Sequence, residues 1–517
     1  MFKNWDLPSH INVILLLLIF VFPVNDLFGQ SKDEKGRRRI NIINAETLEY
    51  SDQLGDNVQR LKGNVQFENK GTLLFCDSAY FYPNNFIEAF GNVHVNKGDS
   101  IHLYSDMLNF YGDKQLAIAS QNVELNDKDM HLSTDQLHFN LKDNVSSYFT
   151  GGTIVNKENI LVSRKGYYNS NTNLFSFKDS VELSNPDYSI VTDTLQFNTV
   201  TEISYFHGPT TIYSKESTIY TEKGWYNTQT DKSELSLNNI LSTDDQTLIA
   251  DSILYDRKMG IGEAFENVSI SDTANKLLIT GEYGLYNQHS NRSFVTQRAT
   301  MIQAFTDDSL FLHADSLWVY RDTVENLNEV YAYYNSRFYK PDIQGICDSL
   351  VYIQKDSLIR MYTEPVLWSK ENQITGDSIE ILLYDGEIKQ LNIIAHSFII
   401  SKVDSIHYNQ IKGRNMIAKF KNNEMDRIYV NGNGQTIYFA QEDGEEPKKM
   451  IGVNKLDCAN IIVHVEDSKI KNMTFLTLPS GSLIPMKKAD PSIMKLKEFK
   501  LKDDEKPLSK EDIYRSN

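Results

Sequence analysis

The chain has 517 residues, of which 40% are hydrophobic and 23% charged, so it can bury a core and lacks the composition of a disordered protein. Its 52 basic and 69 acidic residues give a net charge of -17, which opposes non-specific attraction to nucleic acid and to anionic lipid surfaces. The three cysteines, Cys76, Cys347 and Cys458, are an odd and scattered set that gives no disulfide framework. Stability must therefore come from a packed core.

The first 29 residues have the pattern of a secretory signal peptide. Lys3 precedes an apolar run from Val13 to Phe22, and Gly29 comes directly before a polar and charged stretch. Because the run is about half of the ~20 residues that a membrane-spanning helix needs, we expect export with cleavage near Gly29. A retained membrane anchor is the alternative.

An acidic residue recurs along the chain at a fixed position of a repeat, and we call this position the corner. The spacing is 29 residues from Asp77 through Asp251, and it then loosens to 31 and 33. The twelve corner positions are Glu46, Asp77, Asp106, Asp135, Arg164, Asp193, Glu222, Asp251, Glu282, Asp315, Asp348 and Asp377. Such regularity indicates a repeat array in which each unit packs on its neighbours.

Apolar residues lie three positions before the corner and two and four positions after it. Residues five apart cannot share one face of a straight strand, because side chains alternate between the two faces. A bulge or bend at the corner supplies the missing shift, and its short polar side chains can bond to backbone groups that the bend leaves unpaired. The Gly-Asn-Val sequences that begin at Gly63 and Gly91 mark the matching bend on the return strand, where glycine lowers the steric cost.

Each repeat is therefore predicted to be a hairpin of two bent antiparallel strands. Stacked hairpins give an all-β fold of two facing sheets that are joined along one folded edge and open along the other. A parallel β-helix solenoid, in which each repeat forms one rung, is the alternative fold.

Three features together resemble the OstA-like family, which includes the LptA-type proteins of lipopolysaccharide transport. They are the Gly-Asn-Val strand, the Ser-Asp or Asp-Ser corner followed by an aromatic residue, and the signal peptide. The resemblance covers roughly Ile40 to Leu382, and the segment from Cys347 to Ser378 looks most like the long OstA-like proteins of the Bacteroidetes group. It implies a V-shaped β-jellyroll, or β-taco, whose apolar groove carries the acyl chains of lipopolysaccharide across the periplasm.

We accordingly divide the chain into four parts: a signal peptide (1–29), an OstA-like β-repeat array (30–382), a divergent continuation of the array (383–486) and a charged tail (487–517). The apolar positions around the corner supply candidates for the lipid groove. They are Leu74, Phe81, Leu103, Leu108, Phe110, Leu132, Leu137, Phe139, Ile190, Leu195, Phe197, Ile219, Gly224 and Tyr226. We expect the glycines two positions after the corner, Gly166, Gly224 and Gly284, to leave gaps along the groove.

An open stack exposes unpaired strands at its ends, and the first strand is expected near Ile40 to Asn44. Ile40, Ile42 and Ile43 are therefore candidates for contact with a partner through strand pairing. The resemblance implies that such partners are other lipopolysaccharide transport proteins, and a homo-oligomer is a further possibility.

The sequence contains no enzyme signature in a supporting context. It has no Ser-His-Asp arrangement, phosphate-binding glycine loop or Cys-X-X-Cys pair, and no two histidines lie at metal-ligand spacing. Carboxylates at eleven of twelve corners indicate structural capping rather than catalysis or metal binding. We expect no enzyme activity, no cofactor and no nucleic-acid partner.

The leading hypothesis is a periplasmic lipopolysaccharide transport or assembly protein, for which association with the outer membrane is a further possibility. One alternative is an exported β-solenoid scaffold or adhesion module that binds carbohydrate or protein through its outer faces. Another is a polysaccharide-cleaving enzyme with its site in the region of loosened spacing, Asp315 to Asp348. The sequence Tyr331-Ala332-Tyr333-Tyr334 in that region favours packing or partner contact over catalysis.

Overall fold

The structure is a computed structural model that describes residues 31–32, 38–50, 57–69, 71–97, 101–127, 130–215, 217–244, 246–287, 289–290, 292–306, 308–322, 327–384, 387–421, 424–442, 449–466 and 469–515. The predicted signal peptide lies outside these residues. Every strand pairing recorded for the described residues is antiparallel, for example β6 with β7 and β29 with β30. This arrangement confirms the all-β hairpin fold and shows that the parallel β-helix alternative is wrong. Within the described ranges, no helix is long and apolar enough to cross a membrane.

The chain forms two compact units. The N-terminal unit extends to Asp244 and includes Ile249–Gly262, and its strands are β1 (Ser31–Lys32), β2 (Arg38–Arg39), β3 (Asn41–Asn44), β4 (Thr47–Tyr50), β5 (Gln59–Asn69), β6 (Thr72–Phe81), β7 (Phe86–Lys97), β8 (Ile101–Tyr111), β9 (Leu116–Asp127), β10 (Met130–Asn140), β11 (Val145–Tyr148), β12 (Gly152–Asn156), β13 (Asn159–Ser163), β14 (Lys165–Asn169), β15 (Leu174–Ser184), β16 (Tyr188–Asn198), β17 (Ile203–Ser214), β18 (Thr218–Asn227), β19 (Lys232–Leu235), β20 (Asn239–Ser242) and β22 (Ser252–Asp256). Strands β21 (Gln246–Ala250) and β23 (Ile261–Asp272) each contain residues of both units.

The C-terminal unit contains the remaining strands and four short 3-10 helices. They are β24 (Leu277–Asn287), β25 (Arg292–Thr296), β26 (Thr300–Ala304), β27 (Ser309–His313), β28 (Ser316–Asp322), β29 (Leu327–Lys340), β30 (Ile343–Ile353), β31 (Leu358–Tyr362), β32 (Val366–Ser369), β33 (Asn372–Thr375), β34 (Ser378–Tyr384), β35 (Glu387–Ile394), β36 (Ser397–Lys402), β37 (Tyr408–Gly413), β38 (Asn415–Lys421), β39 (Glu424–Gln441), β40 (Met450–Glu466), β41 (Lys469–Leu476), β42 (Ser480–Pro485), η4 (Met486–Lys488), η5 (Pro491–Ile493), η6 (Asp503–Glu505) and η7 (Lys510–Tyr514).

Each long strand of the N-terminal unit changes register once, at the predicted corner. In β6 and β7 the pair Phe75 and His94 is followed by the pair Ser78 and Phe90, so the return strand carries one extra residue at the bend. Leu74 and Ala79 are both buried although they are five residues apart, while the corner residue Asp77 is exposed. The predicted shift of strand phase at the corner is therefore confirmed.

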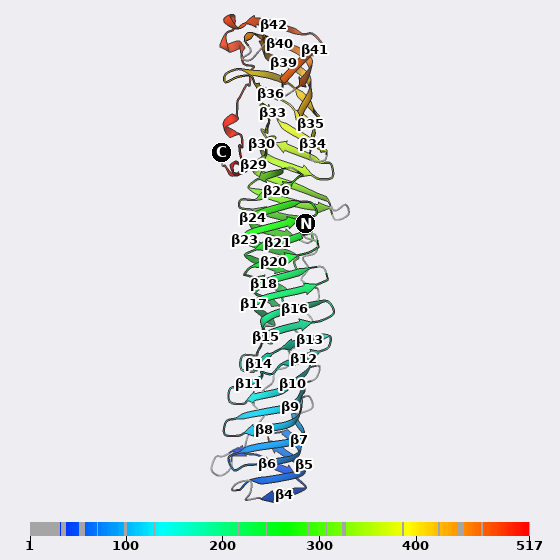
Figure 1. Cartoon of the computed structure of the whole chain (residues 1–517), viewed down its shortest axis with the longest axis vertical. Helices are drawn as coiled ribbons and strands as arrows, with labels where there is room; N and C mark the ends of the chain where they lie inside the picture. The colour runs from blue at the N-terminus through cyan, green and yellow to red at the C-terminus, as the bar shows by residue number, and fades with distance from the viewer. Residues whose placement is uncertain are drawn as a thin grey trace. The chain divides into compact units, whose positions relative to one another are not determined.

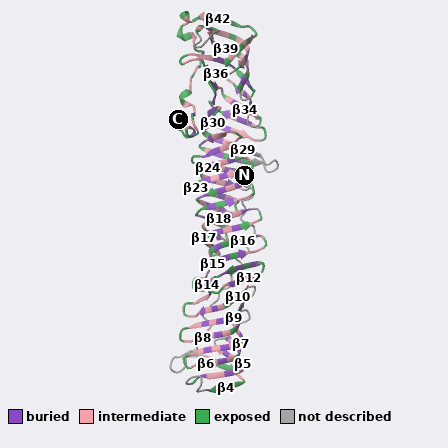
Figure 2. Cartoon of the chain, viewed as in Figure 1, coloured by how far each residue is buried: buried purple, intermediate pink, exposed green. Residues whose placement is uncertain are grey.

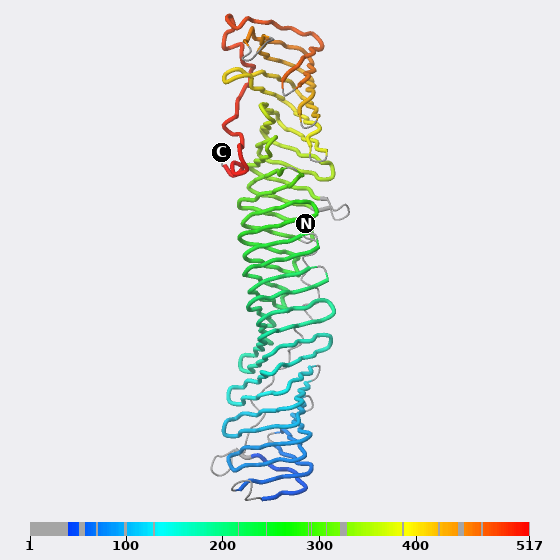
Figure 3. The backbone as a smooth tube through the Cα atoms, in the orientation of Figure 1, coloured from blue at the N-terminus to red at the C-terminus, as the bar shows by residue number. Residues whose placement is uncertain are grey.

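The bend divides every repeat into two sheets. We call the half before the corner wing A and the half after it wing B, and the return strand passes through them in the opposite order. Figures 1 and 3 show the successive rungs of the N-terminal unit from β5 onward, and Figure 2 shows buried residues on each of these rungs. The hydrophobic core lies between the inner faces of the two wings.

The corner carboxylate accepts a hydrogen bond from the asparagine of the next return strand. Asn92 Nδ2 lies 2.9 Å from Asp77 Oδ2, and Asn122 Nδ2 lies 2.6 Å from Asp106 Oδ2. Both asparagines have positive φ angles, of 42° and 47°, and asparagine tolerates this conformation better than most residues. Gly91 has a φ of 73°, and a Cβ atom there would lie 2.4 Å from Asp77 Oδ2, so this position favours glycine, although Gln121 takes a φ of 67° at the equivalent position of the next repeat.

The repeat with Arg164 at its corner exchanges the charges between the two strands. Lys165 Nζ lies 2.7 Å from Asp179 Oδ2, so the carboxylate is on the return strand and the cation beside the corner. Asp179 and Ser180 have the positive φ angles that glycine and asparagine have elsewhere, 62° and 56°. These contacts support a structural role for the corner charges.

Candidate functional site

The predicted groove residues lie on the inner faces of the wings in the N-terminal unit. All of them except Phe81, which is half-buried, are buried, and the branched and aromatic side chains from Leu74 to Tyr226 are 1–6% exposed. Leu74, Leu103 and Ile190 belong to wing A, whereas Leu108 and Phe110 belong to wing B. The repeat pattern therefore brings the predicted set together into one continuous apolar interior within this unit.

Aromatic residues four positions after the corner line the outer end of wing B, where the two sheets are farthest from their common fold. Phe110, Phe139, Tyr168, Phe197 and Tyr226 are 1–5% exposed. Tyr168 also stacks on Phe175 of the next strand, with ring centroids 4.2 Å apart. Flat side chains at this position cover the interior along its open edge.

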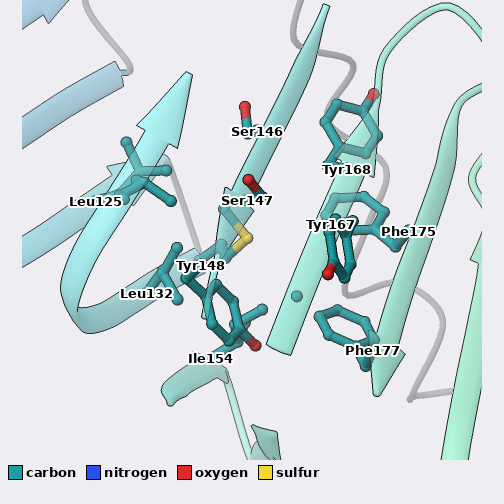
Figure 4. Close-up of a pocket in the computed structure, with 13 residues that line it drawn as sticks. Leu125, Leu132, Ser146, Ser147, Tyr148, Ile154, Tyr167, Tyr168, Phe175 and Phe177 are labelled. Carbon is teal, nitrogen blue, oxygen red and sulfur yellow. The ribbon is translucent and has the colours of Figure 1, made fainter. Parts of the chain in front are cut away.

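Figure 4 shows a small apolar cavity between the inner faces of the two wings. Its volume is about 40 Å³, and it lies between Leu125 and Leu132 of wing A and Phe175 and Phe177 of wing B. This space is enough for about three water molecules, but apolar cavities of such size stay dry. Because the predicted groove side chains other than Phe81 are only 1–6% exposed, the interior at these positions is a filled core in this conformation, and an acyl chain can enter only if the wings separate.

Tyr148 connects the wings across this interior. Its hydroxyl lies 2.6 Å from Ser163 Oγ, on the last position of wing A before the corner. Burial raises the pKa of Tyr148 to about 12, so the phenol remains neutral and keeps its hydrogen bond over the physiological pH range. A buried polar link of this kind fixes the distance between the wings near the fold.

The prediction that these glycines leave gaps is wrong at Gly224 and Gly284, where neighbouring atoms fill the space, whereas Gly166 lines the small pocket between the wings. A Cβ atom on Gly166 would lie 2.3 Å from the Tyr148 ring, and one on Gly224 would lie 2.6 Å from the Glu234 carbonyl oxygen. On Gly284 it would lie 3.3 Å from Val268. The space that a side chain would take at these glycines is occupied by a side chain or a backbone group from a neighbouring strand.

The rims of the wings approach each other at Tyr188 of wing A and Tyr226 of wing B. Burial raises the pKa of Tyr188, and the nearby Tyr226 hydroxyl adds to the shift. The Tyr226 hydroxyl donates to Asp231 Oδ1 at 2.8 Å. Both phenols are buried, with Tyr188 3% and Tyr226 2% exposed.

A set of hydroxyl residues directly before the corner was missing from the predicted site. Ser105 Oγ donates to the Met107 carbonyl at 3.0 Å, and Thr221 Oγ1 donates to the Lys223 carbonyl at 2.9 Å. They satisfy backbone acceptors at the bend, as short polar side chains do in turns. The signal was present in the spacing of 29 residues that relates Ser105, Thr134, Ser163, Thr192 and Thr221.

The predicted edge strand lies at the surface of the N-terminal unit. All residues of β3 and β4 are exposed, with Ile42 at 37% and Ile43 at 54%, while Ile40 just before them is half-buried. Both strands pair with β5, and within the described residues no strand pairs with their other edge. Their free backbone donors and acceptors make this edge a template for another strand.

No group of three or more His, Cys, Asp or Glu residues is close enough to hold a metal ion in the part of the chain that the structure describes. Burial raises the pKa of the Cys76 and Cys347 thiols to about 12, so neither is a reactive thiolate at neutral pH.

Stacked, bent antiparallel hairpins with an apolar interior between two wings define a β-jellyroll repeat protein. A family model described as OstA-like protein matches residues 37–193 and 218–304, so these parts of the chain are similar to that family. The match falls on the repeats whose corner spacing is most regular and ends within the C-terminal unit.

One similar solved structure is that of LptH from Pseudomonas aeruginosa, described as the LptA homologous periplasmic component of the conserved lipopolysaccharide transport device. It is 12% identical and covers 22% of this chain and 84% of its own, with a TM-score of 0.19. No curated protein matches the chain.

Proposed function

We propose that this protein is a periplasmic transport or assembly protein for lipopolysaccharide that shields acyl chains between wing A and wing B. The observation that carries the proposal is the apolar interior of the N-terminal unit, which continues through successive repeats without a charged residue at the predicted groove positions. The match of residues 37–193 and 218–304 to the OstA-like family model adds support. The filled interior implies that loading separates the wings along their open edge, while the corners act as the hinge.

A closed interior suits a lipid shuttle that is empty. Apolar side chains gain about 25 cal/mol per Å² by leaving water, so empty wings close on each other. When an acyl chain lies between the wings, the inner side chains contact the lipid in place of the opposite wing and stay out of water. The net free energy needed to separate the wings is therefore small once lipid is present. The small residues and hydroxyls at the bend keep the hinge free of bulky side chains.

Photocrosslinking from single positions on β8 tests this proposal. A photoreactive phenylalanine analogue at Phe110, which faces the interior, should crosslink to lipopolysaccharide in living cells. The matched control is the same analogue at Tyr104, which is 40% exposed on the outer face of wing A of the same strand. Equal labelling at the two positions, or none at Phe110 while the protein is folded, would contradict a lipid-shielding interior.

The same proposal assigns the exposed β3 edge to end-to-end pairing with other lipopolysaccharide transport proteins or with a second copy. Ile42→Pro should weaken such association because proline removes a backbone donor, and the fold should survive since β3 is exposed. Sedimentation of the purified chain with and without candidate partners measures the effect. Ile42→Ala keeps the donor and is the control, and association that survives the proline would place the contact elsewhere.

A further inference from the structure

Aromatic side chains gather on the outer face of wing B in the C-terminal unit, away from the apolar interior. The strand register places Phe294, Trp318 and Tyr331 in one row across β25, β28 and β29. The neighbouring row contains Arg292, Tyr320 and Glu329, and Ser316 pairs with Tyr333 on the other side. We call the residues Arg292, Trp318, Tyr320, Glu329, Tyr331 and Tyr333 the aromatic platform.

The platform is exposed to solvent although most of its area is apolar. Trp318 is 37% exposed, Tyr320 41% and Tyr333 39%, and the adjacent Tyr334 is 61% exposed. Single exposed aromatics are ordinary, but several on neighbouring strands mark a binding surface. The opposite face of the same strands is firmly packed, with Val319, Val330 and Ala332 at 2% or less. The rings are therefore held on a fixed sheet.

Wing B is longer in this repeat than in the repeat of β8. β28 continues for seven residues after its corner at Asp315, whereas β8 continues for five after Asp106. The increase in corner spacing to 33 residues is thus used in part to extend the hairpin. Tyr320, which pairs with Glu329 across β28 and β29, lies five residues after its corner, as the last residue of β8 does, so the platform occupies the part of wing B that both repeats share.

The geometry of the platform suits the flat face of a sugar ring. The ring centroids of Tyr331 and Tyr333 are 6.2 Å apart, and the two ring planes are only 11° from parallel. The ring centroids of Trp318 and Phe294 are 4.7 Å apart. An aromatic face carries partial negative charge and attracts the polarised C–H groups of a pyranose. The hollow over these residues has a volume of about 720 Å³, within the ~300–1,000 Å³ of small-molecule sites.

Polar groups that match sugar hydroxyls surround the rings. The Arg292 guanidinium lies 5.9 Å from the centre of the Tyr320 ring and supplies donors. The Tyr331 hydroxyl donates to Glu329 Oε2 at 2.7 Å, which holds that carboxylate beside the hollow as an acceptor. The charges of Arg292 and Glu329 offset each other, and the chain has a net charge of -17. The platform therefore has no electrostatic attraction for a polyanion such as nucleic acid.

We propose that the aromatic platform binds a neutral, hexose-rich oligosaccharide, which stacks on Trp318, Tyr331 and Tyr333 and hydrogen-bonds to Arg292 and Glu329. The stacked rings with a donor and an acceptor at their side match the apolar face and the hydroxyl rim of a sugar, and this match favours such a ligand over a protein partner. The site is separate from the lipid interior and does not depend on it.

Binding of lipid-free sugars to the purified full chain tests the inference. The probes are cellohexaose, maltohexaose, mannohexaose and the polysaccharide that mild acid releases from lipopolysaccharide, each titrated while tryptophan fluorescence is recorded. At least one should bind, and Trp318→Ala and Tyr333→Ala should each weaken its affinity about tenfold or more. Tyr104→Ala, at an exposed aromatic residue outside the platform, should leave the affinity unchanged.

The outcomes separate the possible ligands. If Trp318→Ala fails to fold by circular dichroism, Tyr333→Ala alone decides, because that side chain lies in the surface layer and is 39% exposed. Absence of binding by all four probes, or equal binding by wild type and Tyr333→Ala, overturns the inference. Loss of an in-cell protein crosslink in these variants without any sugar binding also overturns it and makes the platform a protein interface. Crosslinking of lipopolysaccharide at Phe110 is unaffected in every case.

Discussion

The outer face of wing A is open to solvent in the N-terminal unit and covered in the C-terminal unit. In the former, Ile160 and Val162 on β13 are both 43% exposed, and burial alternates strictly along the strand. In the latter, the first four residues of β36 are all buried. The inner faces are apolar and buried in both units. The units therefore differ in whether another segment of the chain covers the outer face of wing A.

The cover in the C-terminal unit is the last segment of the chain, from Met486 to Tyr514. Leu496, Met494 and Phe499 pack on a cluster that includes Phe398 and Phe439. At the far end of the segment, the Tyr514 hydroxyl lies 2.9 Å from Thr300 Oγ1, and its ring lies 4.9 Å from that of His313. The segment that the sequence marked as a charged tail therefore makes the second layer of a two-sided sheet.

Two glutamines hold this segment by bonding its backbone as a neighbouring strand would. Gln410 Nε2 donates to the Met494 carbonyl, and its Oε1 accepts from the Leu496 amide, both at 2.8 Å. Gln373 does the same with the Lys500 carbonyl at 2.9 Å and the Lys502 amide at 2.8 Å. Both glutamines are at most 3% exposed. Glutamine side chains on the face of a sheet can thus bind the backbone of an extended segment, although that backbone pairs with no strand edge there.

Removal of the segment should give the largest effect. Truncation after Pro485 exposes Phe398, Ile400 and Phe439, and each large apolar side chain contributes about 1.5–3 kcal/mol when fully buried. We expect the C-terminal unit to lose several kcal/mol of stability. Hydrogen exchange measured by mass spectrometry should show lost protection in β36 and β39, while β8 and β16 in the N-terminal unit keep theirs. Unchanged protection in β36 would show that the cover is dispensable.

Replacement of the two glutamines should have a smaller effect. Gln373→Leu with Gln410→Leu preserves side-chain size but leaves four backbone groups of the segment without their partners, at about 1–3 kcal/mol for each group that stays buried. The segment can relieve part of this cost by detaching, so we expect a lower unfolding temperature together with faster exchange of residues 494–502. Gln196→Leu, on wing B of the N-terminal unit, is the control. A segment that remains protected would assign its attachment to apolar contacts alone.

Acid should loosen the segment to the smallest extent. A hydrogen bond from Lys412 lowers the pKa of Glu498, and their charged atoms are 2.8 Å apart. Because the folded pKa is lowered, the pair stabilises attachment above the ordinary value of 4.5, and the contribution disappears as pH falls through the lowered value. The protection factors of residues 494–502, corrected for the slower intrinsic exchange in acid, should therefore fall as the pH drops below 4.5 in wild type and vary less with pH in Glu498→Gln. An identical pH profile in both would exclude this ion pair as an anchor.

The spacing of the corner residues is enough to predict the main architecture. Leu74 and Ala79 are five residues apart, and only a bend between them lets both face one core. The corner carboxylates recur too often for catalysis, and their bonds to Asn92 and Asn122 agree with a structural role. The exposed edge at Ile42 also follows from the open end of a stack.

The sequence did not decide how the interior is filled. Because Gly166 has no side chain, the sequence predicts a gap beside it. The ring of Tyr148, on an earlier strand of the stack, occupies that space. Whether a glycine leaves a void depends on the side chains of adjacent rungs, and repeat spacing alone does not specify their rotamers.

By itself, the sequence determined a stack of bent antiparallel hairpins, because a strict period with apolar residues on both sides of a polar corner has one simple solution in strands. The use of the outer faces depends on contacts between distant parts of the chain. The burial of Gln410 and Gln373 depends on a segment 84 and 127 residues downstream of them, and the platform at Trp318 depends on the register between three strands. Long-range contacts of this kind carry no local periodicity, so they are specified only by the folded chain.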